Sequence, residues 1–390
     1  MATSQRTYLD HNATSPLRPE VAEVVLHAHQ LPGNASSVHA EGRAARTEIE
    51  AARVAVAGLV GSRAKNVIFT SGGTEAANLV LTPSFRQLGQ RGATRLLVGA
   101  TEHPCVLNGH RFPADKVGII PVDDQGILDL AWIEAHLGAV GGERVLVSVQ
   151  LANNETGVVQ PVSEIAKLVH GHGGLVHTDA VQAAGRVPVD LPGLGVDALT
   201  LSAHKFGGPK GAGALVLASD QYEIGERLIR GGGQEKNVRA GTENVAAIAG
   251  FGAAAGLALK GLEQEAERLR GLRDEAQAHV RRIAPDALVV GAGAERLPNT
   301  LAFAIPGLKA ETALIAFDLA GVALSSGSAC SSGKVKRSHV LDAMGVEPAL
   351  AEGVLRVSLG WSTTKEDVIR FAEACEKVAA TLYKRKASAA

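Results

Sequence analysis

Cysteine is scarce in this chain, whose 390 residues include only Cys105, Cys330 and Cys375. The three lie far apart and are odd in number. We therefore expect no disulfide framework, and we predict the reduced thiols of a cytoplasmic protein. No Cys and His residues have the spacing of a zinc site. His27 and His29 fall in a helical pattern, where we expect them to face solvent.

Excess charge and long apolar runs are also lacking. The formal net charge is −1, so no strong field attracts nucleic acid or an anionic membrane surface. The longest apolar stretches, such as residues 245–253, are short and broken by glycine, and we expect none of them to span a membrane. Residues 1–10 contain no apolar segment typical of a secretory signal. These absences favour a cytoplasmic protein without membrane or nucleic-acid partners.

A nucleotide-binding P-loop is missing too. From Gly327 to Gly333-Lys334 there is one residue too many between the glycines, and Val335 stands where Ser or Thr is needed. The sequence therefore disfavours an NTPase.

What the sequence does contain is a regular alternation of short β-rich runs and helical patterns. The runs are 67–70, 95–99, 145–149, 174–178, 198–201 and 214–217. Alternation of this kind predicts the α/β class, with a largely parallel, doubly wound sheet.

The pattern changes near residue 256. A long, charged helical stretch at 263–283 leads into short strands at 300–304 and 355–359 and helical patterns at 310–320 and 365–384. We predict a large domain over 15–256 and a smaller α+β domain formed by 1–14 and 257–390.

Polar residues follow several of the predicted strands. Lys205 ends Ser202-Ala-His-Lys, and a lysine there can become a Schiff-base nucleophile if its pKa is lowered; the alternative is a surface lysine. Ser202 and His204 favour the first interpretation, because both could bind a phosphate. Asp179 follows another strand, where ligands of open α/β sheets bind, although it could equally be a helix N-cap.

A second phosphate-binding candidate is Ser71-Gly-Gly-Thr-Glu, which opens a helix after a strand. Free backbone N–H groups at a helix start, together with the Thr74 hydroxyl, can hold a phosphate. A plain helix cap is the alternative, and this motif alone does not decide between them.

Cys330 stands in Ser325-Ser-Gly-Ser-Ala-Cys-Ser-Ser-Gly-Lys, a small polar run without a core pattern. A lone cysteine is more often a buried small hydrophobe, but this neighbourhood is poorly suited to bury one. Lys334, Lys336 and Arg337 could lower its pKa and favour the thiolate. Cys375 lies in a helical run and is expected in the core, and Cys105 is expected to be structural.

Several motifs together carry a family resemblance. They are Ser71-Gly-Gly-Thr-Glu, Thr101-Glu-His-Pro, Asn153-Asn-Glu-Thr-Gly, His177-Thr-Asp-Ala-Val-Gln and Ser202-Ala-His-Lys. In this order they resemble the class V aminotransferases among the fold-type I pyridoxal 5′-phosphate (PLP) enzymes. Arg239-Ala-Gly-Thr-Glu-Asn and the Cys330 segment narrow the resemblance to cysteine desulfurases of the NifS/IscS type. The match extends from Tyr8-Leu-Asp-His-Asn-Ala-Thr to Leu355-Arg-Val-Ser-Leu-Gly, nearly the whole chain.

The resemblance implies PLP as cofactor and assigns roles to particular residues. Lys205 is implied to bind the cofactor covalently, Asp179 to pair with its pyridine nitrogen and Gln182 to meet its phenolate oxygen. His103 is implied to stack on the ring and to move protons. The implied phosphate ligands are Gly73, Thr74, Ser202 and His204, with Thr242 supplied by the partner subunit of a homodimer. Asn154 is implied to contact both the cofactor and the substrate. Asn34 and Arg356 are implied to be further substrate ligands.

The implied reaction removes sulfur from L-cysteine. L-alanine is released, and the sulfur becomes a persulfide on Cys330 for a sulfur-acceptor or iron–sulfur scaffold protein. Cys330 is also the one candidate metal ligand, holding an iron–sulfur cluster transiently at most. An aminotransferase or a selenocysteine lyase of the same fold is the alternative within the family, and a non-catalytic sulfur relay is the alternative outside it. The pathway stays open between iron–sulfur clusters, nitrogenase, tRNA thiolation and thiamin.

Overall fold

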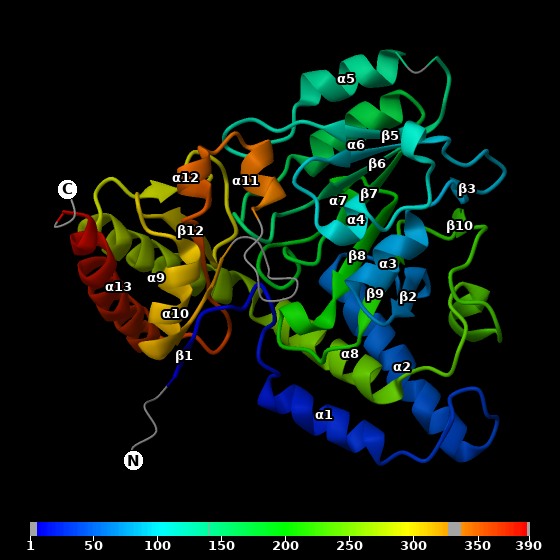
Figure 1. The fold of residues 1–390 in the computed structure, drawn as a ribbon. Coiled ribbons are helices and arrows are strands. Elements are labelled where there is room, and N and C mark those ends of the chain that lie inside the picture. The colour runs from blue at the N-terminus through cyan, green and yellow to red at the C-terminus, as the bar shows by residue number, and fades with distance from the viewer. Residues whose placement is uncertain (1–5, 140, 327–336, 388–390) are drawn as a thin grey trace.

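The computed structural model describes residues 6–139, 141–326 and 337–387. Its largest element is a seven-stranded sheet, which Figure 1 shows on the right. The strands lie in the order β2 (Val67–Thr70), β9 (Gly213–Leu217), β8 (Ala198–Ser202), β7 (Leu175–Asp179), β6 (Val145–Gln150), β4 (Arg95–Gly99) and β5 (Val117–Ile120). Neighbours from β8 to β5 pair in parallel, and only β9 runs against the other strands of this sheet. The predicted α/β class with a mostly parallel sheet is confirmed.

Both faces of this sheet are buried, because successive strand residues point to opposite sides. In β6, Val147 packs with one core cluster and Leu146 with another. The Val147 side is covered by α2 (Ala40–Leu59), α5 (Leu130–Ala139), α6 (Val162–Gly171) and α8 (Val245–Lys260). The opposite side is covered by α3 (Gly73–Val80) and α4 (Pro104–Leu107). This double cover explains why the strands are continuous apolar runs.

Other elements lie at the margin of the large sheet. Helix α1 (Pro19–His29) packs on α8, and His27 and His29 are exposed on it, as expected. A short antiparallel ribbon joins β3 (Phe85–Gln87) to β10 (Tyr222–Ile224), and α7 (Leu191–Leu194) packs beside α6.

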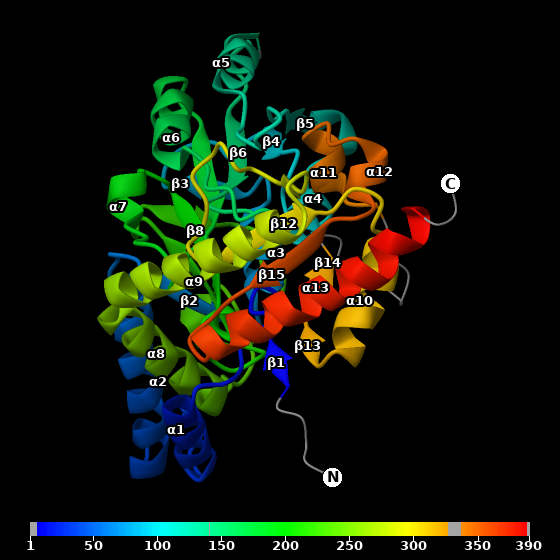
Figure 2. The same ribbon diagram turned by 90° about the vertical axis from the view of Figure 1, so that its left-hand side faces the viewer.

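A second core surrounds a smaller antiparallel sheet. Its order is β11 (Leu288–Val289), β12 (Thr300–Ala304), β15 (Leu355–Ser358) and β14 (Ser325–Ser326). Helices α9 (Leu262–Ile283), α10 (Ala310–Leu319) and α13 (Lys365–Ala387) pack on it, and α9 and α13 lie side by side in Figure 2. Helix α11 (His339–Ala343) covers the other face, with α12 (Pro348–Ala351) beside it.

The beginning of the chain belongs to this second core. Strand β1 (Thr7–Tyr8) pairs in parallel with β13 (Val322–Ala323), and Asp10 bridges to Ser358. The next residues run toward the large sheet, where Ser15 N donates to His204 O at 2.8 Å. The segment from Asp10 to Ser15 therefore passes between the two cores.

In the described ranges, no single helix is both long and apolar enough to cross a membrane; α8 and α9, bent by 75° at their junction, meet that test only as a pair.

Candidate active site

Polar side chains gather where the parallel strands end. Asp179 is the last residue of β7, Ser202 the last of β8, and the Thr101-Glu-His-Pro turn follows β4. Because the carboxyl ends of parallel strands meet at one edge, residues far apart in sequence come together here. This edge faces the segment from Asp10 to Ser15 and strand β15.

Lys205 follows β8 at this edge. Its Nζ donates to Asn12 O at 2.7 Å and to Ala13 O at 2.9 Å. Burial, and then the positive charges of Arg186 and Arg356, lower the pKa of Lys205 to about 8. A substantial neutral fraction exists near that pH, and a neutral amine is the form that attacks a carbonyl.

Asp179 does not cap a helix, because residues 181–186 after β7 form turns, and its part in cofactor binding stays a prediction. Its Oδ1 accepts the Val181 N–H at 2.9 Å, which stabilises the turn after β7. The carboxyl is also almost fully buried, and desolvation raises the pKa of Asp179 to about 6, against the attraction of Lys205. A carboxylate held so close to Lys205 could equally hold a protonated ring nitrogen.

His103 caps α4, and its Nδ1 accepts the Cys105 N–H at 3.1 Å. The ring proton must therefore be on Nε2. Desolvation, followed by the charges of Lys205 and His339, lowers the pKa of His103 to about 4 although the residue presents an exposed face. A neutral, flat ring beside Lys205 fits the role of stacking on a cofactor.

Gly73, at the start of α3, lies close to the turn after β7. A Cβ at this position would be 2.9 Å from Val181 Cγ2 and 3.6 Å from Ser202 Cβ, so glycine lets the helix start approach both. The first helical bond runs from Ala76 N to Gly72 O, which leaves the N–H groups of Gly73, Thr74 and Glu75 without helical acceptors. These donors can bind an anion such as phosphate.

His204 completes this side of the site. Its Nδ1 is 3.1 Å from Thr14 Oγ1, and burial, followed by the charges of Lys205 and Lys210, lowers the pKa of His204 to about 4. The ring is thus a neutral hydrogen-bonding group near Lys205, in keeping with its predicted part in phosphate binding.

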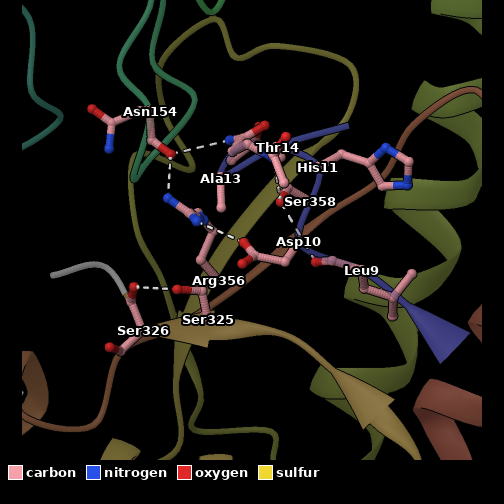
Figure 3. Close-up of polar contacts among 12 residues, drawn as sticks. Leu9, Asp10, His11, Ala13, Thr14, Asn154, Ser325, Ser326, Arg356 and Ser358 are labelled. Carbon is pink, nitrogen blue, oxygen red and sulfur yellow. Dashed lines mark hydrogen bonds and ion pairs between the residues drawn. The ribbon is translucent and has the colours of Figure 1, made fainter. Parts of the chain in front are cut away.

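Arg356 reaches the site from β15 of the smaller sheet. Its Nη1 donates to Asn154 O at 2.9 Å and its Nη2 to Asp10 Oδ1 at 2.7 Å, as Figure 3 shows. The Nε atom is buried without a hydrogen-bond partner in the part of the chain that the structure describes. A buried, unpaired N–H of a guanidinium is a ready donor to a carboxylate. In Asn154 it is the main-chain oxygen, not the side chain, that makes the contact.

Three predicted residues are not brought into this arrangement. Asn34 is exposed between α1 and α2, and its side chain accepts the Ser36 N–H at 2.9 Å. Thr242 is exposed just before α8, in a pocket that it shares with Ser71 and Arg239. Cys330 lies outside the described residues.

The other cysteines are poor nucleophiles. Desolvation, followed by the charges of Asp179 and Glu102, raises the pKa of the Cys105 thiol. Cys375 is 1% exposed in the core between α9, α10 and α13, and burial raises its pKa to about 12. Neither thiol supplies a thiolate near neutral pH. Within the described ranges, no three His, Cys, Asp or Glu side chains form a metal-binding group.

Some residues at this site had no role in the sequence analysis. Asp10 and Asn12 belong to the first motif, which was recognised only as part of the family pattern. Asn12 is 1% exposed; its Nδ2 bonds Asn154 O and Thr300 Oγ1, each at 3.0 Å. It thereby ties the smaller sheet to the site. Arg186 follows Gln182 by four residues within the turns at 181–186, and that spacing is the only signal that could have revealed it.

The arrangement fits PLP on structural grounds. An anion cradle, a buried carboxylate and a neutral ring lie near a lysine with a lowered pKa, and the cations Lys205, Arg186 and Arg356 outnumber the nearby carboxylates Asp179 and Asp10. A negatively charged cofactor would balance them. When bound, PLP withdraws electrons from the substrate's α-carbon and so makes bonds to that carbon easier to break.

Comparisons with known proteins agree with the fold described above. The family model described as Aminotransferase class-V matches residues 7–371. The cysteine desulfurase IscS of Dictyoglomus turgidum is 40% identical over 379 residues, covering 96% of this chain and 94% of that relative. The cysteine desulfurase of Cereibacter sphaeroides is 43% identical over 375 residues, covering 95% and 94%. The solved structure of a NifS-like protein from Rickettsia africae superposes with a TM-score of 0.87 at 35% identity, covering 96% of this chain and 99% of that one.

The chain therefore belongs to the aminotransferase class-V family, a group of PLP-dependent enzymes whose fold it has. Within that family, the relatives named above match almost its entire length and are cysteine desulfurases or NifS-like, and the protein is a PLP-dependent cysteine desulfurase. The predicted family, fold, cofactor and activity are confirmed.

Proposed function

We propose that Lys205 binds the cofactor and moves the substrate's α-proton, while Cys330 accepts the sulfur of L-cysteine. The observation that supports this best is the place of Lys205, whose pKa is lowered to about 8 next to a buried carboxylate and a partly unpaired arginine. A base and a carboxylate receptor are the two groups needed to bind an amino acid and deprotonate its α-carbon.

The substrate carboxylate is bound by Arg356 through Nε, the donor that has no partner among the described residues. Asn154 helps by fixing the guanidinium through its main-chain oxygen. Asn34 stays a predicted substrate ligand. Asp179, Gln182, His103 and the residues of the anion cradle hold the cofactor in the roles that the family resemblance implies.

Sulfur transfer is the step assigned to Cys330. Its thiolate forms a bond to the substrate sulfur while the carbon–sulfur bond of the substrate breaks. The electron pair of the broken bond stays with the carbon fragment, which takes up protons and leaves as L-alanine. The raised pKa values of Cys105 and Cys375 leave Cys330 as the cysteine suited to this attack.

The persulfide is passed to an acceptor, for which we propose an iron–sulfur scaffold or another sulfur-cofactor assembly protein in the cytoplasm. A homodimer is proposed in which Thr242 binds the phosphate of the neighbouring subunit; its exposed position supports this, since it is free to reach outward. The predicted domain limits, 15–256 against 1–14 with 257–390, stay a prediction that the separate core clusters support.

The experiment that tests the site is reduction of the holoenzyme with borohydride, followed by peptide mapping. The cofactor should be fixed on Lys205, and Lys205→Ala should bind it without a covalent link. Attachment to any other lysine would contradict the proposed site.

A further inference from the structure

Arg186 is a buried cation without an acidic partner. It is 5% exposed, and in the described part of the chain its hydrogen-bond acceptors are all neutral oxygens. Nη1 donates to Gln182 O at 3.0 Å and to Gln182 Oε1; Nη2 donates to His11 O and Lys205 O, each at 3.2 Å. None of the described carboxylates forms an ion pair with it. Burying a charge in this way is unfavourable unless something compensates for it.

The contact with Gln182 fixes which way its amide points. A guanidinium has only donors, so the amide atom that faces Arg186 must be the oxygen. The Nε2 group then lies on the other side, where it donates to Asn12 O at 3.0 Å. One of its two N–H bonds is used there, and the second is available to a ligand. The amide orientation is thus fixed from two sides, by Arg186 at Oε1 and by the main-chain oxygen of Asn12 at Nε2.

The same guanidinium also holds the main chain of Lys205. Nη1 of Arg186 thus donates to Gln182. Nη2 donates to the main-chain oxygens of Lys205 and of His11, which lies in the segment between the two cores. Moreover, an anionic cofactor is the natural compensation for this unpaired charge, because its phenolate oxygen would lie near Gln182.

We propose that Arg186 is a positioning residue of the cofactor site, which holds the Gln182 amide with its N–H side toward the cofactor's phenolate oxygen. This rests on the proposed roles of Gln182 and Lys205. Arg186 does not touch the reacting atoms; it acts through Gln182.

The test measures cofactor affinity and the absorption spectrum of the holoenzyme rather than turnover. Apo-protein of each variant is titrated with PLP. Arg186→Met removes every donor and should weaken PLP binding about tenfold, the effect of losing one hydrogen bond to a charged group. Arg186→Lys keeps a donor and should recover part of the loss. Arg273→Met is the control for the loss of a buried guanidinium away from the site, because Arg273 in α9 is also buried, donates to Leu297 O at 3.0 Å and pairs with Asp274.

Combination with Gln182→Ala shows whether Arg186 acts through Gln182. If it does, Arg186→Met should weaken binding about tenfold in the wild-type background and less than about twofold when Gln182 is absent. It should also shift the absorption maximum in the same direction as Gln182→Ala, with no further shift in the double variant. Should Arg186→Met fail to fold, the same cycle is run with Arg186→Lys.

Equal losses in both backgrounds, or a loss with Arg273→Met as large as with Arg186→Met, would overturn the inference. The borohydride experiment separates this failure from failure of the site itself. A cofactor fixed on Lys205 with unchanged affinity in Arg186→Met refutes only the role of Arg186, whereas fixation elsewhere refutes the site.

Discussion

Arg356 and Asp10 form an ion pair across 346 residues of sequence, with 2.7 Å between Nη2 and Oδ1. The arginine side chain is 3% exposed, and its Nη1 donates to the main-chain oxygen of Asn154. Figure 3 shows the guanidinium between these two partners. The arginine that we propose binds the substrate is therefore held in one orientation, and among the described residues its buried Nε–H has no hydrogen-bond partner.

We expect Asp10 to act through this orientation. Asp10→Ala removes the acceptor, so the guanidinium becomes freer to turn and the KM for L-cysteine should rise about tenfold, as for loss of one charge-assisted hydrogen bond. Asp10→Asn keeps an oxygen acceptor at the same place and should change KM much less. Steady-state kinetics at saturating PLP distinguishes the two variants. Equal KM values for Asp10→Ala and wild type would contradict the orienting role.

The raised pKa of Glu155 predicts that the stability of the folded protein depends on pH. Desolvation raises the pKa of Glu155 to about 7, opposed by the Ser338 hydroxyl, which donates to the carboxylate at 2.6 Å. The unfolded chain loses this proton near the ordinary value of 4.5. Between these pH values the folded protein alone keeps the proton, so the contribution of Glu155 to stability falls as pH rises from about 4.5 to 7.

Glu155→Gln removes this decline, because an amide does not titrate. From pH 5 to 8, denaturant unfolding of the apo-protein should show the wild type losing on the order of 1 to 3 kcal/mol relative to Glu155→Gln. Glu134→Gln, which alters an exposed carboxyl on α5, is the control and should follow the wild type. Parallel curves for wild type and Glu155→Gln would show that burial does not shift this group.

Thr242 provides a test of the proposed dimer. Lys205→Ala and Thr242→Ala chains are each expected to be impaired at low cofactor concentration. If Thr242 serves the neighbouring subunit, a mixed dimer has one site with both lesions and one intact site. Mixing equal amounts and allowing the subunits to re-pair should then restore about a quarter of the wild-type sites. If Thr242 serves its own subunit, every site keeps a lesion and no recovery occurs.

Much of the fold could be predicted from the sequence, because both faces of the large sheet are buried. The six predicted runs of that sheet are strands within a residue or so, as 67–70 and 95–99 illustrate. The direction of β9 could not be predicted, since an apolar run that is buried on both faces suits either direction. Strand β5 was missed, because residues 117–120 form a short, partly exposed run with a glycine.

Local sequence patterns predicted less of the site than of the fold. Motifs at strand ends indicated Lys205 and Asp179, whose types and positions suit the chemistry. The ion pair of Asp10 with Arg356 joins opposite ends of the chain, and no local periodicity links such residues. Arg186 was hidden for a different reason, because its partners are mainly main-chain oxygens, which every residue type provides.

The most direct measurement compares L-alanine formation from L-cysteine in wild type, Cys330→Ala, Cys105→Ala and Cys375→Ala, with bound PLP determined in each. Cys330→Ala should keep its cofactor, because the residues around Lys205 are unchanged. Its alanine production should fall to background, because the thiol that takes the substrate sulfur is missing. Cys105→Ala and Cys375→Ala should stay active, since both thiols are protonated near neutral pH. Substantial alanine formation by Cys330→Ala with its cofactor bound would contradict the account.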